Sequence, residues 1–371
     1  MQVAPDGSGN ATITVTGCDG TLPSSAATFD VRQSGTTARF TLPVLSLGSG
    51  PYRVTAHPQM QARPMGETFD ALRDLGAAVE EHATAGALPA TIQGPARGGA
   101  VRVAGDASSQ FLSGLLLSAP CRPDGLVVEV STDLVSRPYV DLTISVMRAF
   151  GAEVEAPDGR TFVVHPGGYR ARSYEVEPDA SAASYAFAAA ALVGGRVRVQ
   201  GLGSDALQGD AAFVEVLGRM GARVDRMAKS TEVRVDPAAT LAGGTFDFRH
   251  ISDTAQTIAV VAPFADRAVS VTGIGFISRK EIDRVTAVAA ELARAGVGVR
   301  VDDGGDGWTI FPGPVAPTTF ETYDDHRMAM SFALLGLRVP GVAIAQPTCV
   351  AKTFPGYWQL LEALRRSAGP R

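Results

Sequence analysis

The chain has 371 residues, of which 45% are hydrophobic and 19% charged, as in a soluble globular protein with room for two domains. Its formal net charge of −5 excludes binding to nucleic acid or to an anionic membrane through overall charge. Any anionic ligand must therefore be held by a local cluster of basic side chains.

The cysteines indicate a reducing environment. Three of them, Cys18, Cys121 and Cys349, lie far apart and have no spacing typical of a metal site. The odd count and sparse usage favour free thiols, which predicts a cytoplasmic protein. No signal peptide is recognisable at the start of the chain, and no apolar run approaches the length of a membrane span.

A helix opening recurs at a nearly fixed interval. Each copy begins with Ser or Asp and continues into a run of small and apolar residues that predicts a buried helix. The copies begin at Ser34, Ser108, Ser181, Ser252 and Asp325, at intervals of 74, 73, 71 and 73 residues. Repetition at a fixed period predicts a repeated structural unit.

A second series of helices runs out of phase with the first. Its members are amphipathic and end at Gly76, Gly151, Gly221 and Gly296, which are spaced by 75, 70 and 75 residues. A glycine just after the last turn ends a helix well, and a strand follows each one. The predicted unit is strand, helix, strand, helix and a strand pair, which defines an α/β (α+β) fold.

The period also predicts how the units are distributed. Residues 1–17 are interpreted as a strand, a turn at Pro5-Asp6-Gly7 and a second strand, so we expect Met1 to lie late in a truncated unit. Five helix openings are present and a sixth unit is implied. We place a domain boundary near residue 177, with a first domain at 1–177 (the truncated unit and two more) and a second at 178–371 (three units).

Polar residues that a plain core would not need gather at the helix openings. If like units stack alike, all openings of one half face one side, and two halves facing each other would enclose a cleft. Several fixed cations in an acidic protein then indicate a small, highly anionic substrate, since arginine grips phosphate or carboxylate bidentately. These cations are Arg63, Lys280, Arg284, Arg327 and Lys352.

Simpler interpretations remain open for these residues. Lys280 to Arg284 could be a solvated helix face. Asp325 and His326 could be a helix cap with a hydrogen-bonded histidine, and Asp179 an ordinary N-cap.

The motifs resemble those of one family over nearly the whole chain. The chain is similar to 5-enolpyruvylshikimate-3-phosphate synthase (3-phosphoshikimate 1-carboxyvinyltransferase). The matching motifs are SGTTARF, ARPMGETFDALRDLGA, DASSQFLSGLLL, SRPYVDLT, VEPDASAASYAFAAAAL, KEIDR, YDDHRMAMSFAL and AKTFPGYW. The resemblance implies a two-domain inside-out α/β barrel, each domain built from three βαβαββ units around inward-facing helices.

The resemblance also implies a reaction and its binding residues. It implies transfer of enolpyruvyl from phosphoenolpyruvate to the 5-hydroxyl of shikimate 3-phosphate with release of phosphate, a step towards chorismate and the aromatic amino acids. Matched by motif, 3-phosphoshikimate would be bound by Ser108, Ser109, Gln110, Ser136, Tyr139, Asp253 and Lys280. Phosphoenolpyruvate would be surrounded by Gly35, Arg63, Gln110, Arg284, Arg327 and Lys352.

The implied chemistry is an addition followed by an elimination. Asp253 would take the proton from the attacking hydroxyl, and Glu281 would protonate and deprotonate the methylene carbon. His326 would lie near the leaving phosphate or orient Glu281. At Gly35 a side chain would crowd the small ligand. The resemblance implies no metal and no organic cofactor, small-molecule partners and a monomer.

The chain departs from the family pattern at several positions. The family's amino-terminal Gly-Ser-Lys motif, which supplies a lysine touching both substrates, occurs nowhere in it. Gln33 stands where Asn is usual, Ser252 where Pro is usual, and Phe276 where an Asn contacts the shikimate ligand. Ile282 replaces a small residue between two acids.

These departures leave two other functions open. One is a degenerate relative that binds an anionic ligand without catalysis or acts on a changed substrate. The other is the enzyme that transfers enolpyruvyl to UDP-N-acetylglucosamine, although Cys18 and Cys121 do not lie in the Gly-rich loop that carries its cysteine. The DNA upstream of the first codon distinguishes an active synthase from the degenerate relative. If it holds no in-frame Gly-Ser-Lys motif, we expect the 371-residue protein to show no measurable turnover and to fold poorly.

Overall fold

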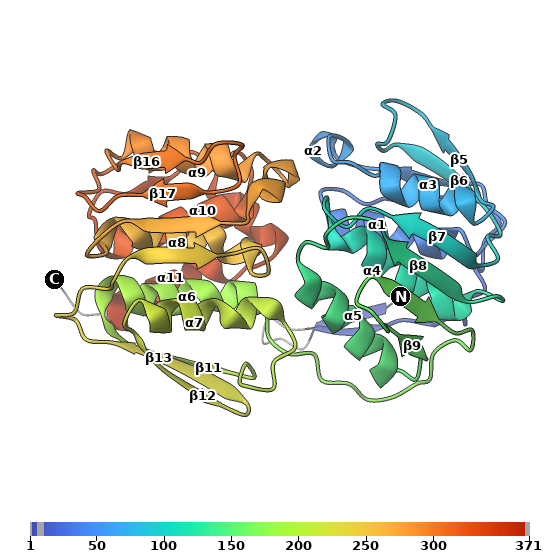
Figure 1. Ribbon diagram of the computed structural model, residues 1–371, viewed down its shortest axis with the longest axis horizontal. Helices are drawn as coiled ribbons and strands as arrows, with labels where there is room; N and C mark the ends of the chain where they lie inside the picture. The colour runs from blue at the N-terminus through green and yellow to red at the C-terminus, as the bar shows by residue number, and fades with distance from the viewer. Residues whose placement is uncertain (1, 6–10, 368–371) are drawn as a thin grey trace. The chain divides into compact units, whose positions relative to one another are not determined.

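The computed structural model describes residues 2–5 and 11–367 (Figure 1). Two compact units are distinguished. The first consists of Met1–Ala104, Gln110–Thr132 and Thr143–Arg172, and the second of Gly105–Ser109, Asp133–Leu142 and Ser173–Arg371. No helix within the described ranges is long and apolar enough to span a membrane.

The predicted βαβαββ unit is present twice in the first half of the chain. The first copy contains β3 (Ala27–Asp30), α1 (Gly35–Leu45), β4 (Tyr52–Thr55), the short α2 (Pro58–Gln61), α3 (Gly66–Asp74), β5 (Ala78–Glu81) and β6 (Ala90–Gln93). The second contains β7 (Gly99–Val103), α4 (Ser109–Ser118), β8 (Leu126–Val130), α5 (Arg137–Ala149), β9 (Val154–Glu155) and β10 (Thr161–Val164). Both sheets have one order, β3-β4-β6-β5 and β7-β8-β10-β9, with the first two strands parallel.

The second half repeats the pattern. A complete copy contains β14 (Gly244–Asp247), α8 (Ala255–Val261), β15 (Val269–Thr272), α9 (Arg284–Arg294), β16 (Val299–Val301) and β17 (Trp308–Ile310), in the sheet order β14-β15-β17-β16. Before it come α6 (Ala180–Val193), β11 (Gly195–Gln200), α7 (Phe213–Arg219), β12 (Arg223–Met227) and β13 (Ser230–Val235). After it come β18 (Thr319–Phe320), α10 (His326–Ala333), β19 (Ala343–Ile344) and α11 (Tyr357–Ser367).

The first strands of the chain agree with the prediction for residues 1–17. β1 (Gln2–Pro5) pairs antiparallel with β2 (Ala11–Thr14). The predicted turn at Pro5-Asp6-Gly7 falls on residues 6–10, outside the described residues.

The helices predicted to be buried are the innermost elements. In the second unit every residue of α8 is buried, as are twelve of the fourteen in α6 and seven of the eight in α10. Small side chains let these helices approach closely, and Ser184 Oγ of α6 lies 3.1 Å from Thr257 Oγ1 of α8. Figure 1 shows α6, α8 and α10 between β16 and β17 at one end of this unit and β11, β12 and β13 at the other.

The predicted helix openings are confirmed, with two refinements. The side chains of Ser34, Asp179 and Asp325 each accept a hydrogen bond from a first-turn N–H of α1, α6 and α10, so the cap of α6 is Asp179 rather than Ser181. The opening predicted at Ser252 starts as a 3-10 turn over Ser252–Thr254, and α8 begins only at Ala255.

The second series of helices ends as predicted. At Gly76, Gly151, Gly221 and Gly296 the φ angles are 92°, 86°, 107° and 81°, values that favour glycine. At each glycine its own N–H and that of the next residue bond back to the helix, for example Gly221 to Gly218 O and Ala222 to Leu217 O. This is the Schellman arrangement, repeated four times.

Two alanine substitutions on α7 should therefore have opposite effects on stability. Gly221→Ala forces a Cβ into positive φ and is expected to lower the free energy of unfolding by about 1 kcal/mol. Gly218 lies within the helix, where a new Cβ would meet Val224 at an ordinary contact distance of 3.5 Å. Gly218→Ala should therefore raise the free energy of unfolding by about 0.5–1 kcal/mol. Urea unfolding of both variants measures this, and equal effects of one sign would refute the cap assignment.

Candidate active site

The first unit carries a cation against the start of α1. Gly35 is the first residue of this helix, and a Cβ there would lie only 2.5 Å from Nη1 of Arg63. Arg63 is 6% exposed, so its guanidinium has little room to move away. The structure thus gives Gly35 a reason that the sequence did not: it makes room for Arg63. That a side chain would crowd a ligand there remains a prediction.

Gln110 is tied to the same helix. Its Nε2 donates to Thr36 Oγ1 at 3.0 Å, and its Oε1 accepts from Nη1 of Arg39 at 2.9 Å. Arg39 is buried, donates also to Pro64 O at 3.0 Å, and lies 4.7 Å from the centre of the Phe111 ring. Buried polar groups with several partners are held rigidly. Gly35, Arg63 and Gln110 therefore gather around the first turn of α1.

The second unit is organised around Arg284, which is 1% exposed. Its Nε donates to Asp325 Oδ2 at 2.8 Å, and its Nη2 to Glu281 Oε2 at 2.8 Å. Its Nη1 lies 3.4 Å from Asp253 Oδ1. One buried guanidinium therefore binds three carboxylates that lie on separate parts of the chain.

Two further cations complete this cluster. Arg327 Nη2 donates to Asp253 Oδ2 at 2.8 Å, and its Nη1 to the Asp253 carbonyl at 3.2 Å. Lys352 Nζ donates to Glu281 Oε1 at 2.8 Å. Asp253 and Glu281 each lie between two cations, so the cluster is a network of charge-assisted hydrogen bonds.

The charges around Asp253 set its protonation. Burial would raise the pKa of this carboxyl, but Arg327, Lys280 and Arg284 together hold the pKa below its usual value. Burial would likewise lower the pKa of Arg284, and Asp325, Glu281 and Asp253 raise it above the ordinary value. Both groups are therefore charged near neutral pH, and Asp253 accepts protons poorly while both arginines bind it.

His326 is a neutral imidazole at physiological pH. Burial and the nearby Arg327 lower its pKa to about 3. Its Nδ1 lies 3.8 Å from Asp325 Oδ1 and has no hydrogen-bond partner in the described part of the chain. Its predicted role beside the leaving phosphate or Glu281 remains a prediction.

The predicted shikimate-binding hydroxyls lie mostly in segments that belong to the second unit. Ser108 and Ser109 are in Gly105–Ser109, and Ser136 and Tyr139 are in Asp133–Leu142, whereas Gln110 belongs to the first unit. All three serines are buried, and Tyr139 OH donates to Asp210 Oδ2 at 3.1 Å. The structure thus places Tyr139 in the same unit as Asp253 and Lys280.

The simpler interpretations are partly excluded. Arg284 is not on a solvated helix face, because it is buried and its partners lie on the inner side of the unit. Asp325 does cap α10 by accepting from Arg327 N at 2.8 Å, and it binds Arg284 as well. Asp210 and Thr36 were not singled out by the sequence, because the partners that bring them to the site, Tyr139 and Gln110, lie more than 70 positions away in the chain.

The departures from the family pattern are accommodated in different ways. Phe276 lies below Lys280, whose Nζ is 5.8 Å from the ring centre, so a cation–π contact stands where the family has an amide. Gln33 donates to Gln59 Oε1 at 3.2 Å. Ser252 is buried in the 3-10 turn before α8, where nothing in the structure explains the change from Pro.

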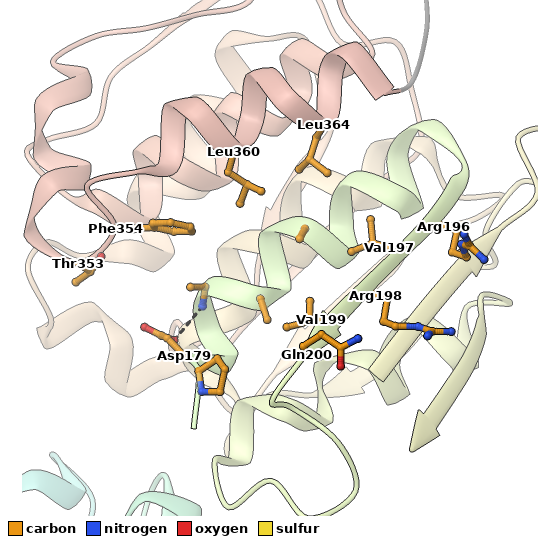
Figure 2. Close-up of a pocket in the computed structure, with 14 residues that line it drawn as sticks. Asp179, Arg196, Val197, Arg198, Val199, Gln200, Thr353, Phe354, Leu360 and Leu364 are labelled. Carbon is orange, nitrogen blue, oxygen red and sulfur yellow. Dashed lines mark hydrogen bonds between the residues drawn. The ribbon is translucent and has the colours of Figure 1, made fainter. Parts of the chain in front are cut away.

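A separate hollow of 680 Å³ lies between α6, β11 and α11 in the second unit (Figure 2). Its lining is mainly apolar and includes Ala182 and Ala186 of α6 and Leu360 and Leu364 of α11. Figure 2 also shows Asp179 at the start of α6, where its carboxylate accepts from Ala182 N at 3.0 Å. None of the predicted site residues lines this hollow.

Solved structures define the class to which this fold belongs. An EPSP synthase from Acinetobacter baumannii covers 90% of this chain and 78% of its own length with a TM-score of 0.73 at 24% identity. The enolpyruvyl transferase NikO from Streptomyces tendae has a TM-score of 0.67 over 89% and 75% of the two chains at 20% identity. The chain has the two-domain inside-out α/β fold of the enolpyruvyl transferases, which confirms the predicted fold class.

The sequence narrows this class further. A family model described as EPSP synthase (3-phosphoshikimate 1-carboxyvinyltransferase) matches residues 2–361. Relatives named 3-phosphoshikimate 1-carboxyvinyltransferase from Nostoc sp. and Methanosphaerula palustris are 42% and 43% identical, over 94% of this chain and 81% and 82% of their own lengths. The chain belongs to the EPSP synthase family, and the resemblance seen in the motifs is confirmed.

Proposed function

We propose that this protein transfers the enolpyruvyl group of phosphoenolpyruvate to the 5-hydroxyl of 3-phosphoshikimate, forming 5-enolpyruvylshikimate 3-phosphate and phosphate. The observation that carries the proposal is the Arg284 cluster, in which buried cations and acids stand at the positions that the family motifs mark. Relatives with the corresponding name at 42–43% identity support it. The enzyme would serve aromatic amino acid biosynthesis.

We assign the two substrates to different sets of side chains. Hydroxyl and amide groups with one acid and one lysine suit a phosphorylated, hydroxylated ring: Ser108, Ser109, Gln110, Ser136, Tyr139, Asp253 and Lys280. Fixed cations, together with one glycine and one amide, suit the compact trianion phosphoenolpyruvate: Gly35, Arg63, Gln110, Arg284, Arg327 and Lys352. Arginine favours these anions because its planar fork donates two parallel hydrogen bonds.

The reaction needs a proton to leave the hydroxyl and another to reach the methylene carbon. The 5-oxygen forms a bond to C2 of phosphoenolpyruvate while Asp253 takes its proton and Glu281, in its acid form, protonates C3. In the second half C3 returns a proton to Glu281 and the C2–O bond to phosphate breaks, which restores the double bond. The proton held by Asp253 passes to the departing phosphate, so both acids return to their starting states. When substrate anions bind Arg327 and Arg284, these arginines stabilise the Asp253 carboxylate less. The pKa of Asp253 then rises, and its carboxylate accepts a proton more readily than in the free protein.

The compartment, oligomeric state and domain bounds are inferred from the family and the composition. We infer an enzyme of small-molecule metabolism that acts as a cytoplasmic monomer, with its domains at 1–177 and 178–371. The support is the family, the free thiols at Cys18, Cys121 and Cys349, and the low net charge of −5. Size-exclusion chromatography with light scattering tests the oligomeric state.

The function is tested by ³¹P NMR with both substrates present. The assay is run on the 371-residue chain and on the chain extended through any in-frame upstream Gly-Ser-Lys segment. We expect phosphate and an enol ether product to appear together, and only when both substrates are supplied. Binding of 3-phosphoshikimate without turnover in either form would favour the non-catalytic homologue, and turnover of UDP-N-acetylglucosamine instead would refute the proposal.

Gly35→Ala should weaken phosphoenolpyruvate binding selectively. The new Cβ would overlap the Arg63 guanidinium at 2.5 Å and displace it, so we expect the KM for phosphoenolpyruvate to rise about tenfold or more. The KM for 3-phosphoshikimate should change much less. The matched control is Gly66→Ala, also the first residue of a helix, where the Cβ would be 3.8 Å from its nearest neighbour. An unchanged KM for phosphoenolpyruvate would contradict the placement of Arg63.

A further inference from the structure

A buried acid next to the site has no role in the reaction described so far. Asp210 lies in the 3-10 turn Gly209–Ala212 before α7 and is 2% exposed. Its Oδ2 accepts hydrogen bonds from Tyr139 OH at 3.1 Å and from Ser181 Oγ. Its Oδ1 has no hydrogen-bond partner among the described residues. Burying a carboxyl is costly, so its retention here needs a compensating role.

The two residues before Asp210 contact the same neighbouring segments, namely the one that carries Tyr139 and the start of α6. A Cβ on Gly209 would lie 2.5 Å from Cβ of Pro138, so the glycine lets the two segments touch. Gln208 Oε1 accepts from Ala180 N at 2.9 Å, and its Nε2 donates to Pro178 O at 2.6 Å. The turn Gln208–Asp210 thus contacts both the start of α6 and the segment that carries Tyr139.

The segment that carries Tyr139 requires such support. Ser136 has a φ of 51°, a left-handed conformation that is uncommon for a residue other than glycine, asparagine or aspartate. It persists only where the surroundings determine it. Two backbone bonds contribute, from Tyr139 N to Ser136 O and from Val135 N to Gly105 O, both at 3.0 Å. Gly209 and Asp210 add contacts with Pro138 and Tyr139 of the same segment.

We propose that the turn Gln208–Asp210 is a positioning element for the phosphorylated ring substrate: Asp210 fixes the Tyr139 hydroxyl, and Gly209 seats Pro138. This rests on the proposed function, because Ser136 and Tyr139 are assigned there to 3-phosphoshikimate. The positioning acts through Tyr139, and Asp210 itself touches no substrate in this assignment.

Among the described residues, the charges that act most strongly on Asp210 come from two other segments. They are Asp253 from the turn before α8 and Arg327 from α10, with the phenol of Tyr139 and the hydroxyl of Ser181 as neutral partners. Burial first, and then Asp253, raise the pKa of Asp210 to about 6. Replacing the acid by asparagine therefore removes a group that changes charge in the working pH range while it keeps an acceptor for Tyr139.

The test compares four variants of the full chain by calorimetric binding of 3-phosphoshikimate. Asp210→Ala is expected to raise the Kd about tenfold, since a positioned hydrogen bond is lost, and Asp210→Asn about threefold or less. Tyr139→Phe should add little in the Asp210→Ala background. The matched control is Asp205→Ala, an exposed acid in the same loop, which should leave the Kd unchanged. Asp210→Ala with wild-type affinity and only a lowered Tm would overturn the proposal.

A second measurement needs no ligand. If Asp210 and Tyr139 act as one unit, the loss of Tm in the double variant Asp210→Ala/Tyr139→Phe is smaller than the sum of the single losses. Additive losses would overturn the contact itself. A wild-type chain that fails to bind 3-phosphoshikimate but shows non-additive losses would refute the proposed function and leave the contact standing.

Discussion

Replacing Arg284 by methionine is expected to lower the free energy of unfolding by about 3–5 kcal/mol, because removing one partner of a buried ion pair leaves the others uncompensated. Three carboxylates lose a partner at once: Asp253, Glu281 and Asp325. Methionine fills a similar volume, so a cavity contributes little. The variant should also lose turnover, since Arg284 is assigned to phosphoenolpyruvate.

The loss should depend on pH in a stated direction. Arg284 is one of the cations that hold the pKa of Asp253 below its usual value. Without it the folded-state pKa of Asp253 rises, so part of the stability that the low pKa provides is lost. This part of the deficit in unfolding free energy is present in full above the ordinary carboxyl pKa of about 4 and shrinks as the pH falls below that value.

Urea unfolding of wild type and variant at several pH values measures this. The matched control is Arg365→Met, which removes an arginine whose pair with Glu362 is exposed and should leave the stability nearly unchanged. A deficit that is the same for both variants, or independent of pH, would show that the Arg284 cluster is not electrostatically coupled.

The repeated architecture could be predicted because its signals are local. A C′ glycine and a capping Ser or Asp act within one turn of a helix, so their spacing shows the period directly. The same signals predicted the wrong first residue for α6 and α8. In α6 the repeat placed the opening at Ser181, whereas the simpler interpretation of Asp179 as an ordinary N-cap is confirmed, because its side chain accepts from Ala182 N.

The site could be predicted only in part, since its contacts join residues far apart in the chain. Arg284 and Asp325 are 41 positions apart, and Tyr139 and Asp210 are 71 apart. The family motifs marked Arg284 and Tyr139, but nothing in the sequence connected either to its partner. Asp210 in particular looks like an ordinary turn residue until its burial is known.

Two buried groups of the second unit should change its free energy of unfolding with pH in opposite directions. The pKa of His326 is lowered to about 3, chiefly by burial, against about 6.5 for an unfolded histidine. Between these values the unfolded chain binds the extra proton, so stability rises with pH. The pKa of Asp210 is raised to about 6, again chiefly by burial, against about 3.9 when unfolded. Here the folded chain binds the extra proton, so stability falls as the pH rises.

Between pH 4 and pH 6 the two contributions should nearly cancel, each amounting to roughly 1 kcal/mol per pH unit. His326→Asn removes the rising contribution, so relative to wild type its unfolding free energy should fall by about 2–3 kcal/mol from pH 4 to pH 6. Asp210→Asn should show the opposite slope, and the double variant should follow the wild-type pH dependence again. Chemical denaturation across this range tests all three. Single variants with wild-type slopes would mean that neither group keeps its shifted pKa, and the neutral imidazole assigned to His326 would be wrong.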